Sequence, residues 1–189
     1  TCAEITKQLQ EGNKEYLEYF KIIRDISGND IKRIYKYLDV NFDYYYGESD
    51  SYNYIPKLTK ILNEKNLLIS SNGAKVIDIS KEIDKKELPP LIFQKSNGAY
   101  LYGTTDMATV LERVNDFNPD HIVYFADIRQ DLHYTQFFRA VDKADIIDEN
   151  KLEFHGFGTV NGVDGKPYKT REGKSPSLDS LFCEVKDLL

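Results

Sequence analysis

A strand–helix–strand pattern in the last third of the chain limits the folds that this sequence can adopt. Residues 121–126 (HIVYFA) form a near-continuous apolar run, which is typical of a buried parallel strand. Residues 130–143 follow with helical spacing, and residues 152–157 return to a strand pattern. Parallel strands joined by a helix form a right-handed βαβ unit. The sequence therefore predicts an α/β fold that contains a parallel sheet.

The rest of the chain shows helical periodicity and two hairpin signals. Apolar residues recur at three- and four-residue steps, which predicts amphipathic helices. Asn-Gly occurs twice between apolar runs, at Asn72-Gly73 and Asn97-Gly98, and both residues of this pair tolerate the positive φ of a tight hairpin. The predicted elements are helices at 3–26, 31–38 and 54–65, a strand at 40–44, hairpins at 67–77 and 91–102, a helix at 104–115 capped by Thr104–Asp106, and a final helix from Leu178.

Composition excludes several classes of protein. The 189 residues include 25 Lys and Arg against 31 Asp and Glu, a net charge of −6, whereas a general nucleic-acid coat should be basic. No stretch approaches the roughly 18 apolar residues of a membrane helix. Cys2, Cys183 and the three histidines lack metal-ligand spacing, so we expect no metal site and no disulfide scaffold, in a cytoplasmic protein. The first residue is Thr1 rather than Met, within a helical pattern, which suggests a fragment.

Polar residues after the middle strand are the first candidates for a site. Ligands of open parallel sheets bind beyond the carboxyl ends of the strands, where the sequence places Asp127, Arg129, Gln130 and His133. The structural alternative is a helix cap followed by a solvated first turn.

A basic loop at 165–174 is the second candidate. It holds four cations and one carboxylate between glycines, and such loops can bind phosphate oxygens. The alternative is a solvated surface loop. The sequence contains neither the P-loop motif nor G-x-G-x-x-G.

Tyr102 and Asp106 are the third candidate, because they lie four residues apart near a predicted helix start. A carboxylate beside an aromatic ring suits a cationic ligand. The alternative is that Asp106 caps the helix while Tyr102 packs. The run Tyr44–Tyr46 is interpreted as strand packing rather than a platform for stacking bases.

Several segments, in order, resemble one family, the arginyl-tRNA synthetases of class I. Tyr100–Ala108 resembles the family segment Y-x-[TA]-T-x-D-[LIM]-A, and Asp127–Gln136 is similar to D-x-R-Q-x-x-H-x-x-Q. The last strand and signature loop of the family resemble His155–Val160, Asp164–Lys166 and Lys169–Gly173, and Leu38–Ser49 also fits. The resemblance covers essentially the whole chain.

The resemblance implies a partial Rossmann-like parallel sheet with a helical N-terminal segment and a small antiparallel hairpin insertion. Residues 1–50 would hold the helical segment and one strand of the catalytic core. Residues 51–100 would be the inserted helix and hairpins, and residues 101–189 the second half of the nucleotide-binding fold, with the signature loop at 165–174.

The resemblance also implies substrates and roles. Such enzymes activate L-arginine with ATP, accompanied by Mg²⁺, and transfer it to tRNA(Arg); no bound cofactor is expected. The residues implied to bind arginine are Tyr102, Asp106 and Gln130. The residues implied to bind ATP are His133, His155, Gly158, Val160, Lys166, Lys169, Thr170 and Arg171.

Two departures from the family pattern affect what this chain can do. The loop has Thr170 and Arg171 where the class I motif K-M-S-K-S has its last Lys-Ser, and no H-x-G-H occurs anywhere. The helical anticodon-binding domain follows the signature loop in the family. We therefore expect a fragment of an arginine–tRNA ligase that is inactive alone and binds tRNA weakly. The alternative is a free-standing nucleotide- or amino-acid-binding module that has no ligase activity.

Overall fold

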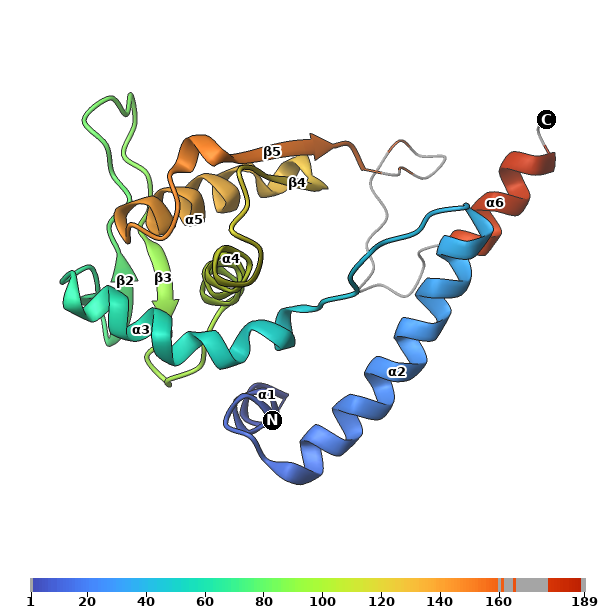
Figure 1. Cartoon of the computed structure of the whole chain (residues 1–189), viewed down its shortest axis with the longest axis horizontal. Helices are drawn as coiled ribbons and strands as arrows, with labels where there is room; N and C mark the ends of the chain where they lie inside the picture. Colours follow the sequence, from blue (N-terminus) through green and yellow to red (C-terminus); the bar gives the residue numbers. More distant parts are fainter. Residues whose placement is uncertain (1, 160, 162–164, 166–176, 188–189) are drawn as a thin grey trace.

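The computed structural model describes residues 2–159, 161, 165 and 177–187. Strands β4 (Ile122–Asp127) and β5 (Leu152–Phe157) pair in parallel, with Ile122 opposite Leu152 and Asp127 opposite Phe157. The chain passes from one strand to the other through α5 (Asp131–Lys143), which lies alongside both strands in Figure 1. Short 3₁₀ turns, η2 (Ile128–Gln130) and η3 (Glu149–Lys151), flank this helix. The predicted βαβ unit is confirmed.

An antiparallel sheet forms the second layer, in the order β1 (Ile69–Ser71), β2 (Ala74–Ile77) and β3 (Leu91–Gln94). The turn between β1 and β2 has φ values of 49° at Asn72 and 78° at Gly73, so the first predicted hairpin is confirmed. The second predicted hairpin is mostly wrong. Its returning strand is reduced to one bridge between Gln94 and Tyr100, because β3 pairs with β2 and a helix begins at Tyr102.

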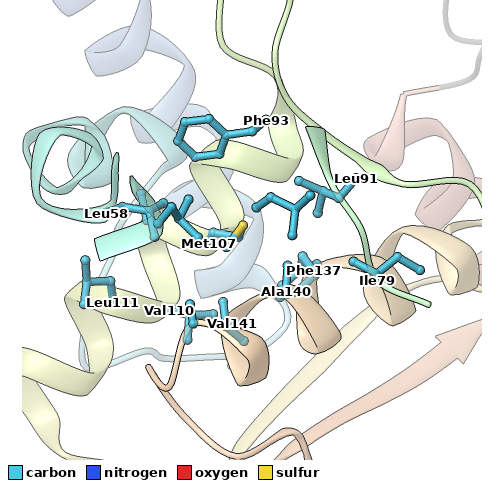
Figure 2. Close-up of a cluster of buried hydrophobic side chains, with 14 of the residues drawn as sticks. Leu58, Ile79, Leu91, Phe93, Met107, Val110, Leu111, Phe137, Ala140 and Val141 are labelled. Atoms are coloured by element: carbon cyan, nitrogen blue, oxygen red, sulfur yellow. The ribbon is translucent and has the colours of Figure 1, made fainter. Parts of the chain in front are cut away.

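Helix α4 (Tyr102–Phe117) begins two residues before its predicted cap. Thr104 and Thr105 cannot cap it, because their hydroxyls donate to carbonyl oxygens, that of Thr105 to the Tyr102 carbonyl at 2.9 Å and that of Thr104 to the Phe93 carbonyl. Helix α3 (Ile55–Glu64) matches its prediction. Buried side chains from α3, α4, α5, β3 and the segment after β2 meet in one core, shown in Figure 2: Leu58, Ile79, Leu91, Phe93, Met107, Val110, Leu111, Phe137, Ala140 and Val141.

The N-terminal helices break at a different place from the predicted one. Helices α1 (Cys2–Gln10) and α2 (Lys14–Tyr37) are separated at Gly12, whose φ is 87°, and the Asn13 side chain caps α2 by accepting from the Tyr16 amide. α2 continues through the predicted stop at 27–30, since one glycine inside a helix costs only about 1 kcal/mol. The predicted strand at 40–44 is also wrong. Its Phe42 ring packs on Tyr35 of α2 at 4.9 Å, and no described strand pairs with it.

The end of α2 contacts the last helix. Helix α6 (Leu178–Asp187) starts where the sequence predicts and lies beside α2 in Figure 1. Arg33 pairs with Asp179 at 2.6 Å, and the rings of Tyr37 and Phe182 lie 5.4 Å apart. These contacts join two segments that are far apart in the chain. The domain boundaries at 50 and 100 stay a prediction.

The face of the parallel sheet that points away from α5 is exposed. Phe125 is 73% exposed, Phe157 56% and Val123 42%. Within the described ranges, no helix is long and apolar enough to cross a membrane, and no three His, Cys, Asp or Glu side chains are grouped to hold a metal ion.

Candidate functional site

The closest polar contact between predicted site residues joins Asp106 on α4 to His133 on α5. Nε2 of His133 lies 2.5 Å from Oδ2 of Asp106, and both side chains are largely buried, with 11% and 30% of their surfaces exposed. Asp106 is the fifth residue of α4, and the cap position belongs to Leu101. The capping alternative for Asp106 is therefore excluded. A carboxylate held by an imidazole at the carboxyl end of a parallel strand is placed to bind a cation.

Tyr102 lies one turn before Asp106 and contacts the same histidine. Its ring stands edge-on to His133, with centroids 4.5 Å apart, and 57% of the residue is exposed. A pocket of about 370 Å³ opens beside the two rings, and its lining also includes Gln136, Pro89 and Lys95 but neither Asp106 nor Glu48. This volume is in the range of small-molecule sites. A larger groove of about 720 Å³ runs along α2 past Lys32 and Tyr45 and is lined by none of the predicted site residues that are described.

Glu48 is a second carboxylate of this site that the sequence analysis missed. Glu48 begins the 3₁₀ helix η1 (Glu48–Tyr54), which packs against α4. Partial burial raises the pKa of Glu48, the nearby Asp106 carboxylate raises it further, and His133 lowers it. The only sequence signal was the resemblance of 38–49 to the family, which gave Glu48 no role.

Aromatic rings pack around His133. His133 contacts Tyr134 and Phe137 at 5.4 and 5.1 Å, and Tyr134 stacks on Phe154 of β5 at 4.3 Å. Burial raises the pKa of Tyr124 to about 12. The charge of Asp106 contributes to this shift, which places Tyr124 within the field of that carboxylate. The aromatic rings lower the local dielectric, so an ionic contact made at Asp106 is stronger than in water.

The other polar residues at the end of β4 were predicted either to bind a ligand or to cap a helix. Asp127 caps η2 by accepting from the Arg129 amide at 2.9 Å, and it also binds the Arg129 guanidinium at 2.6 Å. For these two residues the structural alternative holds. Gln130 ends η2 with an exposed side chain, and its predicted role in binding arginine stays a prediction.

The predicted ATP residues are only partly described. His155 lies on the exposed face of β5, stacked on Phe125 at 5.3 Å and paired with Glu153 at 2.9 Å. Gly158 is exposed just beyond β5. His133 lies with Asp106 and not with His155. The other predicted ATP residues, Val160, Lys166, Lys169, Thr170 and Arg171, lie outside the described residues.

Comparison with known proteins assigns the chain to a family. Residues 2–188 match the family "tRNA synthetases class I (R), catalytic domain". The chain is 44% identical over 183 residues to the arginine–tRNA ligase of Agathobacter rectalis, and 43% identical over 185 residues to that of Alkaliphilus oremlandii. These matches cover 96% and 97% of this chain but 31% and 32% of the relatives, so the chain spans about a third of their length.

The fold leads to the same family. The crystal structure of arginyl-tRNA synthetase from Plasmodium falciparum superimposes with a TM-score of 0.69 at 26% identity, over 96% of this chain and 31% of that one. The predicted fold class, a partial class I synthetase core, is confirmed by this match. The chain belongs to the catalytic-domain family of the class I tRNA synthetases of the arginine type.

Proposed function

We propose that this chain is part of an arginine–tRNA ligase, in which it supplies the arginine pocket and the signature loop. The full-length protein activates L-arginine with ATP to arginyl-adenylate and transfers the arginyl group to tRNA(Arg). The single observation that carries the proposal is the Asp106–His133 pair at 2.5 Å, in which His133 also contacts Tyr102 and lines a pocket with it.

The charges of the site favour a guanidinium as the ligand. Asp106 and Glu48 are close enough for the charge of Asp106 to raise the pKa of Glu48. A cation between them removes this repulsion. A planar guanidinium offers paired N–H donors to a carboxylate, which an ammonium group cannot match. His133 holds one oxygen of Asp106 and so orients the carboxylate, while the Tyr102 ring provides a face for the cation.

The adenylation step places the ATP next to this pocket. The arginine carboxylate attacks the α-phosphorus of ATP, and pyrophosphate leaves with its Mg²⁺. We propose that the backbone from His155 to Val160 binds the adenine, and that Lys166, Lys169, Thr170 and Arg171 bind the phosphates, whose developing charge needs fixed donors. We propose Gln130 as a further contact of arginine and His133 as a further contact of ATP. A cytoplasmic location, where tRNA is charged, agrees with the exposed free thiols of Cys2 and Cys183.

This chain alone is proposed to be inactive. Its sequence contains no H-x-G-H, which by resemblance supplies donors on the other side of the phosphates. Its net charge of −6 gives little attraction for tRNA phosphates, so we also expect weak tRNA binding.

Arginine-dependent ATP–pyrophosphate exchange, with tRNA(Arg) present, tests the proposal. The full-length protein should catalyse exchange with arginine and not with lysine, while the present chain should catalyse none. Exchange by the present chain at the rate of the full-length protein would contradict its proposed inactivity. Binding of arginine or ATP by the full-length protein without exchange would instead support a binding module that has no ligase activity.

A further inference from the structure

Ser51 connects the two elements that carry the carboxylates Glu48 and Asp106. It lies in η1, three residues after Glu48, and no part of it is exposed. Its hydroxyl lies 2.8 Å from the Glu48 carbonyl oxygen and 3.3 Å from the Thr105 carbonyl oxygen. Thr105 immediately precedes Asp106 on α4. One buried proton is therefore shared between the backbone that carries Glu48 and the backbone that carries Asp106.

A second contact fixes the other side of η1. The Asp50 carboxylate accepts from both terminal nitrogens of Arg24 on α2, at 2.7 and 2.5 Å, and from the Gly47 amide at 2.7 Å. This clamp holds the first turn of η1 but does not reach α4. Among the described residues, two side-chain hydrogen bonds join η1 to α4. The Tyr54 hydroxyl donates to Asp116 at 2.9 Å near the far ends of both helices, whereas the Ser51 hydroxyl reaches the carbonyl of Thr105, the residue next to Asp106.

The backbone position of η1 decides how far Glu48 stands from Asp106. Electrostatic energy between two carboxylates and a shared cation changes steeply with distance inside a partly buried site. A shift of one ångström in a binding group is enough to weaken a pre-organised site. A buried hydroxyl that fixes this separation therefore acts on the ligand through Glu48, without touching the ligand.

We propose that Ser51 is a positioning residue for the guanidinium of arginine, which holds Glu48 at its working distance from Asp106. This inference rests on the proposed function and adds a residue to it. Without the hydroxyl, the Glu48 end of η1 relaxes away from Thr105, while Tyr54 still holds the other end to α4, and Glu48 and Asp106 separate. The site then keeps both carboxylates but binds a guanidinium less well.

The test uses Ser51→Ala in the full-length protein, with Thr109→Val as the matched control. The Thr109 hydroxyl donates to the same Thr105 carbonyl at 2.9 Å but belongs to α4 itself, so its loss leaves η1 untouched. Ser51→Cys serves as a second variant, because it fills the same space with a much weaker donor. The measurements are the KM values for arginine and ATP in pyrophosphate exchange, the pH dependence of the arginine KM, and the thermal midpoint.

We expect Ser51→Ala and Ser51→Cys to raise the arginine KM about three- to tenfold, and to leave the ATP KM and the kcat nearly unchanged. The arginine KM should rise at acid pH as Glu48 takes up a proton, and we call this rise the acid limb. In both Ser51 variants the acid limb should move to lower pH, because separation from Asp106 lowers the pKa of Glu48. Thr109→Val should show neither effect. A lower thermal midpoint with an unchanged arginine KM, an equal effect of Thr109→Val, or an unmoved acid limb would each overturn the inference. If the unmodified protein shows no arginine-dependent exchange, the proposed function fails first and the inference fails with it.

Discussion

Gly156 on β5 lies so close to Ile128 on η2 that a side chain has no space between them. A β-carbon built on Gly156 would stand 2.9 Å from Cα of Ile128 and 2.3 Å from its Cδ1. The contact brings the turn after β4 directly against the neighbouring strand, at the end of the sheet where the site lies.

Gly156→Ala should therefore destabilise the protein. The flexible end of Ile128 can move, but its backbone cannot, so we expect a loss of about 1–3 kcal/mol in the free energy of unfolding. Urea unfolding measures it. Gly158→Ala is the control, because nothing lies within 4 Å of a β-carbon at that position. Equal stabilities of the two variants would show that the close approach is absent in solution.

Asp106→Asn should weaken arginine binding while leaving ATP binding nearly unchanged. It keeps the shape and removes the charge that, in the proposed function, pairs with the guanidinium. Loss of one partner of a largely desolvated pair costs about 2 kcal/mol or more, roughly 30-fold in affinity. Isothermal titration of the full-length protein with arginine measures the change. Asp120→Asn is the control, because it removes the same charge at an exposed position, and it should leave arginine binding unchanged. An unchanged dissociation constant would remove Asp106 from the arginine site.

Glu48→Gln should change how arginine binding depends on pH. Burial and the charge of Asp106 raise the pKa of Glu48 above its ordinary value of 4.5. Binding that needs the ionised form is therefore lost as the pH falls through this raised pKa, at a higher pH than an ordinary carboxylate would give. The variant should have a higher arginine KM near neutrality and should lack that acid limb. The exposed Glu64→Gln is the control, and an identical pH profile in Glu48→Gln and the unmodified protein would contradict the assignment.

Asp84→Asn should remove a pH-dependent contribution to stability. Both Asp84 oxygens accept from Arg139, at 2.7 and 2.8 Å, and this pair together with the Lys81 amide lowers the pKa of Asp84 from 3.8 to about 2. A depressed folded-state pKa stabilises the fold above pH 3.8, and the contribution disappears as the pH falls toward 2.

Urea unfolding at pH 7, 3 and 2 checks this prediction. The difference in stability between the unmodified protein and Asp84→Asn should be largest at pH 7 and should shrink on acidification. Asp120→Asn again controls for the general effect of losing one carboxylate. A difference that stays constant from pH 7 to pH 2 would mean that the Arg139 pair is not formed in solution.

The sequence predicted those elements whose signal is local. The runs that became β4, β5, α3 and α5 carry their own periodicity, and Asn72-Gly73 carries its own turn geometry. The strand expected at 40–44 failed because alternation does not supply a pairing partner, and the rings there pack on α2 instead. The helix break was placed at 27–30 rather than at Gly12 because both segments contain residues that break helices, and local sequence could not rank them.

The candidate site was predictable only in part. Asp106 and Tyr102 stand out by spacing, since they lie one turn apart at a helix start. The partnership of Asp106 with His133 joins residues 27 positions apart, and the resemblance named both without pairing them. Glu48 was missed because its meaning depends on the packing of η1 against α4, which no local pattern encodes.

The bare face and edge of the parallel sheet have a consequence for handling this chain. β4 pairs with β5 on one side, and no other described strand satisfies its second row of backbone N–H and C=O groups. Phe125 and Phe157 stand exposed on the open face. Unpaired edges beside apolar surface favour pairing between molecules. We expect the isolated chain to self-associate, so its unfolding midpoint should rise with protein concentration, as it does for any species stabilised by mass action.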